Sequence, residues 1–212
     1  MKTEQFFYFA MLSMLVLISA CKKEDDPEPS PSAGFTVTKD TVAVDEVIQF
    51  TNTSANATAF VWSFGDGNSS TETSPQKAYA TSNVFVVTLS ATGSGGTELF
   101  TKNIRVLPFT SFTVVDEANA VSGVPVQFAN DSKGATSYEW SFGDPGNTTS
   151  TDENPTFTYA AGGTYTVTLK ANGAGGQGVS TKTVTVNQGA DVKELFYIEY
   201  NAALIRKLAL DG

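Results

Sequence analysis

Few side chains in this sequence are suited to chemistry. The chain contains one cysteine, Cys21, and no histidine. Without histidine it has no histidine general base, no Ser-His-Asp or Cys-His nucleophile, and none of the usual histidine-bearing zinc sites. A single cysteine excludes an intrachain disulfide and a thiolate-rich metal site. The remaining candidates are the Cys21 thiol and two aspartates, Asp66 and Asp144, each of which follows a Phe-Gly pair.

The two aspartates are interpreted as turn residues rather than catalytic carboxylates. Asp66-Gly67 is a tight-turn signal, because Asp bonds nearby backbone amides and Gly accepts a positive φ. Asp144-Pro145-Gly146 plays a similar part, with the proline setting φ. We therefore expect neither aspartate to act in catalysis, and we expect no cofactor and no metal at these turns. Calcium at the domain entrances stays an alternative, although no dense carboxylate loop is present. Its candidate ligands are Asp40, Asp45 or Glu46, and Asp116 or Glu117.

Cys21 ends an apolar leader. Residues 6–18 are mostly apolar, and as a helix they would rise about 20 Å, too little for a hydrocarbon core of about 30 Å. We therefore predict a signal peptide over residues 1–20. The run Ile18-Ser19-Ala20-Cys21 resembles the lipobox of bacterial lipoproteins, which implies a diacylglycerol on the Cys21 thiol and fatty acylation, such as palmitate, of its amino group. An ordinary secretory signal with an incidental cysteine is the alternative.

The segment after Cys21 is acidic and rich in proline and serine. Residues 21–33 cannot bury enough apolar area to fold, so we expect an extended tether. The segment resembles the acidic export signal of surface-exposed lipoproteins in some Gram-negative bacteria, and a plain linker is the alternative. We expect a lipid-anchored protein of the cell envelope, at the outer membrane, with the leaflet left open. The net charge of −9 argues against nucleic acid as a partner.

The chain contains two copies of one unit. Phe60-Val61-Trp62-Ser63-Phe64-Gly65-Asp66-Gly67 recurs in altered form as Tyr138-Glu139-Trp140-Ser141-Phe142-Gly143-Asp144. The spacing of the matched residues predicts units at residues 34–107 and 109–188.

Within each unit the hydrophobic period is two. Trp62 lies on one face of a predicted strand with its aromatic neighbours, and Trp140 repeats this arrangement. Thr, Val and aromatic residues dominate such runs, and turn residues separate them. Ser94-Gly95-Gly96 and Ala174-Gly175-Gly176 are predicted to turn the last hairpin of each unit. The pattern predicts an all-β fold in which two antiparallel sheets pack face to face, with both tryptophans in the cores.

The repeated unit resembles the PKD domain, an immunoglobulin-like β-sandwich marked by a W-x-F-G-D-G run and a later Y-x-V-x-L strand. The residues that carry the resemblance in the two copies are Trp62, Phe64, Gly65, Asp66 and Gly67, and Trp140, Phe142, Gly143 and Asp144. Pro145 breaks the triplet in the second copy, which leaves its turn geometry open but not its fold.

The resemblance implies a non-catalytic module that serves as a spacer or contacts proteins or polysaccharides at the cell surface. One alternative is an accessory part of a secreted or surface hydrolase whose catalytic domain follows residue 212. Another is a surface glycan-binding lipoprotein, which requires aromatic platforms that face water.

The last residues depart from the repeat. Residues 189–212 resemble the start of a YWTD-type β-propeller blade, with an aromatic strand and a terminal Leu-Asp-Gly. That resemblance implies a fragment of a longer protein, since one blade cannot bury its own faces. An amphipathic helix over residues 192–208 is the alternative.

Overall fold

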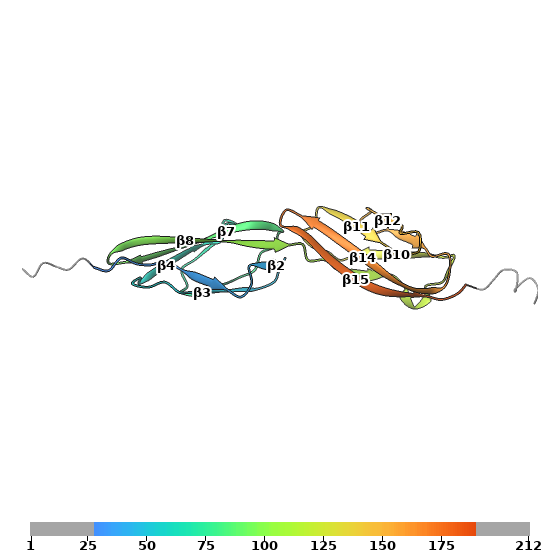
Figure 1. Cartoon of the computed structure of the whole chain (residues 1–212), viewed down its shortest axis with the longest axis horizontal. Helices are drawn as coiled ribbons and strands as arrows, with labels where there is room; N and C mark the ends of the chain where they lie inside the picture. Colours follow the sequence, from blue (N-terminus) through green and yellow to red (C-terminus); the bar gives the residue numbers. More distant parts are fainter. Residues whose placement is uncertain (1–27, 190–212) are drawn as a thin grey trace, which may run out of the picture.

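The computed structural model describes residues 28–189, which form two β-domains placed end to end (Figure 1). The strands of the first domain are β1 (Phe35–Val37), β2 (Thr41–Ala43), β3 (Ile48–Asn52), β4 (Ala59–Ser63), β5 (Ser69–Ser70), β6 (Gln76–Lys77), β7 (Asn83–Gly93) and β8 (Gly96–Leu107). Those of the second are β9 (Phe112–Val114), β10 (Pro125–Asn130), β11 (Ser137–Ser141), β12 (Thr149–Ser150), β13 (Thr156–Thr158), β14 (Gly163–Gly173) and β15 (Gly176–Val186), with one 3-10 turn, η1 (Glu117–Asn119). The predicted all-β class is confirmed.

Each domain has two sheets. In the first they have the strand orders β1-β3-β6 and β2-β8-β7-β4-β5, and in the second β13-β10-β9 and β12-β11-β14-β15. The expectation of purely antiparallel sheets is wrong for β2, which runs parallel to β8 with Thr41 opposite Arg105. The second domain has a single parallel bridge, Val121 to Asn187. Among residues 28–189 no helix has the length and apolarity that a bilayer crossing requires.

The core of each domain lies between its two sheets and is centred on a tryptophan. Trp62 and Trp140 are both 0% exposed, as predicted. The rings of Phe35 and Phe50 approach the Trp62 ring at 5.0 and 5.6 Å, in edge-on geometry that suits aromatic quadrupoles. The alternating run on β7 is also confirmed, because its four inward side chains, Phe85, Val87, Leu89 and Ala91, are all buried.

The longest strands form one hairpin in each domain. β7 pairs with β8 along their length and closes through Ser94-Gly95, and β14 and β15 close through Ala174-Gly175. Both turns stand where the glycine pairs predicted them. The β14–β15 hairpin tip points toward the first domain, and this placement brings the two domains into contact (Figure 1).

Candidate functional site

The two tryptophans are satisfied inside the cores. Trp62 donates its indole N–H to the carbonyl oxygen of Glu72 at 2.8 Å, and Trp140 donates to that of Asp152 at 2.9 Å. Their rings and their polar atoms are therefore both engaged by the protein. Neither indole is placed to stack on a sugar in solvent, so the glycan-binding alternative receives no aromatic platform from these two residues.

A buried tyrosine ties the two sheets of each domain together. The hydroxyl of Tyr79 donates to the carbonyl oxygen of Phe64 at 3.0 Å, and Tyr159 donates to Phe142 at the same distance. Burial raises the pKa of both hydroxyls, and the neighbouring Asp66 charge raises that of Tyr79 further. Both tyrosines belong to the residues that carry the resemblance to the PKD domain, at equivalent places in the two copies, but their hydrogen bonds were not predicted from the sequence.

Asp66 is held by hydrogen bonds and an ion pair. Its carboxylate accepts from Lys77 Nζ at 2.6 Å and from the backbone and side-chain nitrogens of Asn68 at 3.1 and 2.9 Å. Partial burial raises the pKa of Asp66, but the bonds from Lys77 and Asn68 lower it more, so it lies below its ordinary value. Lys77 Nζ also lies 5.6 Å from the ring centroid of Phe64 and 5.3 Å from that of Tyr79. Asp66 therefore organises its own turn, in which Gly67 adopts a φ of +87°.

Asp144 organises a different turn. Its carboxylate accepts from Gly146 N–H at 3.1 Å and from the backbone N–H and hydroxyl of Thr148, both at 2.8 Å. Burial raises the pKa of Asp144, but these bonds lower it below its ordinary value. Asn147, with a φ of +53°, takes the left-handed conformation here. No lysine within residues 28–189 pairs with Asp144. Phe157 occupies the place of Lys77 and stacks on Phe142 with ring centroids 4.4 Å apart.

The glycine before each aspartate is required by a close backbone approach. A Cβ on Gly65 would lie 2.8 Å from the carbonyl oxygen of Val86, and one on Gly143 would lie 2.4 Å from that of Thr166. Both glycines also have positive φ, +78° and +71°. The Phe-Gly-Asp run is therefore dictated by packing against β7 or β14.

The candidate calcium ligands do not converge. Within residues 28–189 no group of three Asp or Glu side chains is arranged to hold a metal ion. All five carboxylates bind other side chains instead: Asp40 with Thr41, Asp45 with Lys133, Glu46 with Lys39, Asp116 with Asn119 and Glu117 with Lys182.

The domains meet at a junction built around Ser82, which is 8% exposed. Its hydroxyl donates to the carbonyl oxygen of Val106 at 2.9 Å and accepts from the N–H of Gly175 at 3.0 Å. A Cβ on Gly175 would lie 1.8 Å from the same Val106 oxygen, so only glycine fits at this hairpin tip. On the surface, Lys133 pairs with Asp45 across the junction at 2.8 Å. The glycine pair at residues 175–176 predicted a turn here, but not this contact with the first domain.

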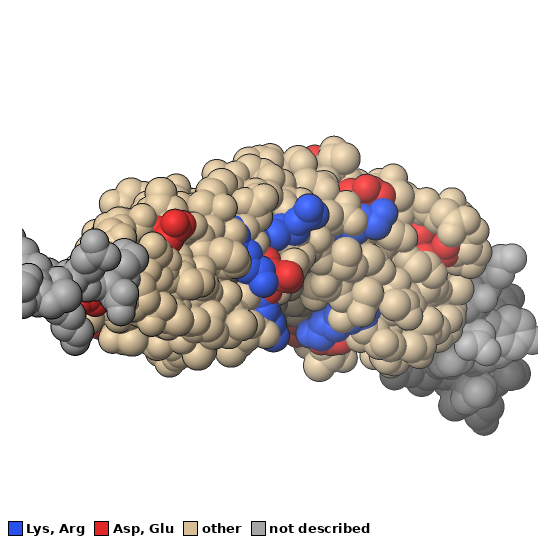
Figure 2. All heavy atoms as spheres, turned by 60° about the vertical axis from the view of Figure 1, so that its left-hand side comes forward, with Lys and Arg blue, Asp and Glu red and all other residues tan. Residues whose placement is uncertain are grey.

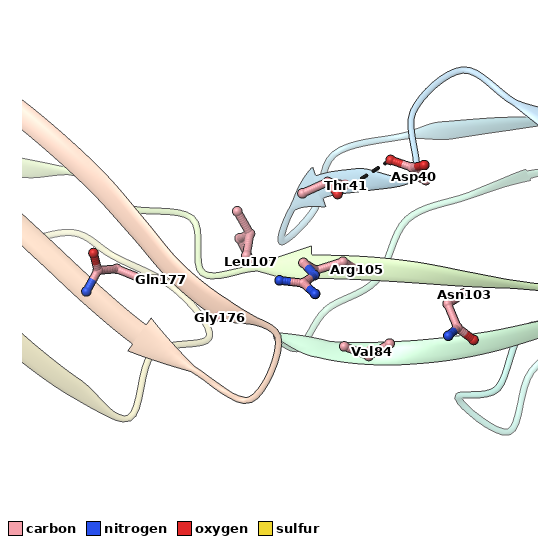
Figure 3. A pocket seen from close by; sticks show the side chains of 8 residues that line it. All are labelled: Asp40, Thr41, Val84, Asn103, Arg105, Leu107, Gly176 and Gln177. Carbon is pink, nitrogen blue, oxygen red and sulfur yellow. Dashed lines mark hydrogen bonds between the residues drawn. The ribbon is translucent and has the colours of Figure 1, made fainter.

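A groove of about 540 Å³ opens beside the junction (Figure 3). The first domain contributes Asp40, Thr41, Asn103 and Arg105 to its wall, and the second contributes Gln177. Charged side chains gather around the hollow between the two domains on this view of the molecule (Figure 2). The groove is thus a polar site that neither domain forms alone.

Comparison with known proteins identifies one family. A sequence model of the PKD domain matches residues 28–107 and again residues 110–188. Among solved structures, the PKD1 domain of Vibrio anguillarum Epp is 26% identical, with 39% of this chain and 96% of that chain covered and a TM-score of 0.33. The PKD1 domain of the Vibrio cholerae metalloprotease PrtV is 30% identical, with coverages of 38% and 98% and a TM-score of 0.33. A Methanosarcina mazei protein solved by NMR is 21% identical, with coverages of 50% and 74% and a TM-score of 0.34.

Proposed function

The chain belongs to the PKD domain family, in two tandem copies, and from this membership we propose that it is a non-catalytic stalk of the cell envelope. The two domains would hold an interaction surface away from the membrane. The first copy's Asp66, which could otherwise be suspected of catalysis, is engaged by Lys77 and Asn68. Asp144 has no lysine partner among the described residues and is engaged instead by Gly146 and Thr148.

The observation that carries this proposal is the direct packing of the second domain on the first. β8 ends at Leu107, and Phe109 already pairs with Lys133 of the second domain, so Pro108 alone separates the two. Flexible spacing would need a longer linker rich in glycine and serine. Because Ser82 also bonds to Gly175, the two domains are suited to act as a rigid spacer that does not bend at the junction.

We further propose that the stalk is anchored through lipid on Cys21, at the outer membrane. The tether predicted over residues 21–33 is too long at its end, because Ser32 pairs with Ala55 and Glu28 accepts from Ser94, so we propose residues 21–27 as the tether. Cys21 lies outside the described residues, and the support comes from the Ile18-Ser19-Ala20-Cys21 run. Each buried methylene of an acyl chain contributes about 0.8 kcal/mol, and more than one chain is needed for stable anchoring. A diacylglycerol with an added amide-linked chain meets that requirement.

Cell fractionation tests the anchor. Wild-type protein should label with a palmitate analogue and sediment with membranes, whereas Cys21→Ala should lose the label and either appear in the soluble fraction or remain unprocessed. Ser32→Ala, at an exposed position where only the backbone pairs with Ala55, is the matched control and should behave as wild type. Membrane retention and labelling that are unchanged in Cys21→Ala would refute the anchor.

Solution scattering tests the stalk separately. The full chain in detergent should give one maximum dimension that changes little with ionic strength. The buried contact between Ser82 and Gly175 is uncharged, and the Lys133–Asp45 pair across the junction is exposed and weak. A distribution that shifts toward compact, bent particles would contradict the stalk even if the lipid anchor were correct.

A further inference from the structure

The groove at the junction contains the guanidinium of Arg105, which forms no ion pair with any carboxylate of residues 28–189. Residues 28–189 include seven Lys and Arg side chains and fourteen Asp and Glu side chains. Five of the seven basic side chains form ion pairs within this part of the chain, and the two that do not are Lys102 and Arg105. In so acidic a pair of domains, an arginine without a carboxylate partner at the wall of a groove is a candidate for binding an anion from outside.

The backbone fixes both sides of this groove. Arg105 N–H donates to the carbonyl oxygen of Asp40 at 2.8 Å, which places β2 beside β8. On the other side, the bond between Ser82 and Gly175 holds the hairpin tip in place, and Gln177 Nε2 donates to Asn172 Oδ1 at 2.9 Å. The guanidinium of Arg105 lies between these two walls (Figure 3). The strands that carry these polar side chains are therefore held in place without a ligand.

The combination of polar groups restricts the ligand. Arg105 only donates hydrogen bonds, and the Asp40 carboxylate only accepts them. A ligand with nothing but negative charge would be attracted by Arg105 and repelled by Asp40. A ligand that carries hydroxyl groups beside its carboxylate satisfies both, because the hydroxyls donate to Asp40. The amides of Asn103 and Gln177 and the hydroxyl of Thr41 both donate and accept, as hydroxyl recognition requires.

From these features we infer that the interdomain groove binds an acidic sugar, a uronic acid unit of a polysaccharide, through Arg105, Asp40, Asn103 and Gln177. Its volume of about 540 Å³ lies within the range of small-molecule sites, about 300–1,000 Å³. Val84 and Leu107 are the only apolar side chains that residues 28–189 place in the wall of the groove. The apolar side chains of a peptide would therefore find few contacts there. The site would exist whether or not Cys21 carries lipid.

Binding of oligogalacturonate to the immobilised full chain tests this inference. We expect trigalacturonate to bind at least about tenfold more tightly than the neutral galactose trimer, and Arg105→Gln to weaken the acidic trimer at least about tenfold, as expected for a lost charge-assisted bond. Lys102→Gln is the matched control, because it removes the same charge from the same strand. Gln177→Ala should also weaken binding, which would show that the second domain contributes.

Several outcomes would overturn the inference. One is a loss of affinity for trigalacturonate that is equal in Arg105→Gln and Lys102→Gln. The others are equal binding of the acidic and neutral trimers, and no binding of trigalacturonate at millimolar concentration. Tighter Arg105-dependent binding of a short peptide with a free terminal carboxylate would reassign the groove to peptides. Unchanged melting temperatures would establish that the variants are folded. Fractionation of the Cys21→Ala protein is independent of all these results, so the anchor and the groove can fail separately.

Discussion

Replacing Lys77 with methionine tests how much the first domain depends on the Asp66–Lys77 ion pair. Methionine keeps most of the methylene chain that packs near Phe64 and Tyr79 but removes the charge. The pair is largely buried, with side chains 16% and 17% exposed, so loss of its charge-assisted hydrogen bond would cost about 1.5–3 kcal/mol. The cation–π contacts at 5.3 and 5.6 Å add about 0.5–1 kcal/mol. Because Asn68 still binds Asp66, we expect a net loss of about 2 kcal/mol.

Calorimetry of the full chain measures this loss. About 2 kcal/mol should lower the melting temperature of the first domain by roughly 8–16 °C, since 1 kcal/mol moves a domain of this size by about 4–8 °C. The second domain has Phe157 in place of Lys77 and serves as the internal control, so its transition should not move. A decrease in the second transition as large as that in the first would show that the substitution acts through the junction instead.

The pH dependence provides an independent check. The folded pKa of Asp66 lies below its ordinary value, so the pair stabilises the first domain above about pH 4, and that stabilisation disappears as the pH falls through the folded pKa. The stability difference between wild type and Lys77→Met should therefore close in acid. A difference below about 0.5 kcal/mol at pH 7, or one that persists in strong acid, would refute this account of the pair.

Three further changes test the cores and the junction. Trp62→Ala or Trp140→Ala removes a fully buried indole and should cost about 3–5 kcal/mol, enough to unfold that domain while the NMR signals of the other stay dispersed. Gly175→Ala should leave both domains folded by circular dichroism but separate them in solution scattering; unchanged scattering would contradict the packed junction. Burial raises the pKa of Tyr79 and Tyr159, so in a spectrophotometric titration both should stay protonated when exposed tyrosines ionise. Because the folded pKa exceeds the unfolded one, stability should fall as the pH rises past about 10.

Periodicity was enough to predict which side chains fill the cores. A period of two puts alternate residues on opposite faces, so Trp62 and Trp140 could be placed without knowing which strands pair. The direction of pairing is a different matter. Thr41–Ala43 is three residues long and carries too little pattern to indicate that it runs parallel to β8. Strand direction depends on the path of the chain between strands, and local alternation does not encode it.

The parts of the candidate sites that were missed are long-range. Lys77 lies 11 residues after Asp66, on β6. Its ammonium group reaches the Asp66 carboxylate only when β6 pairs with β3. Gly175 is a turn residue by local rules, and only the approach of Val106 in the other domain makes it indispensable. The geometry of the Pro145 turn, by contrast, has a local cause. Proline fixes its own φ, so a different residue, Asn147, takes the left-handed conformation.

The tip of each long hairpin contacts the part of the chain that precedes its own domain. The tip at Ser94-Gly95 touches the segment before the first domain, where Ser94 Oγ donates to Glu28 at 3.1 Å and a Cβ on Gly95 would lie 2.6 Å from the Pro29 carbonyl oxygen. The tip at Ala174-Gly175 touches the first domain in the same manner. A head-to-tail contact uses different surfaces on its two sides, and the two copies lie end to end, so further copies can be appended in line. The molecule consequently has polarity, and gene duplication would extend its reach by one repeat at a time.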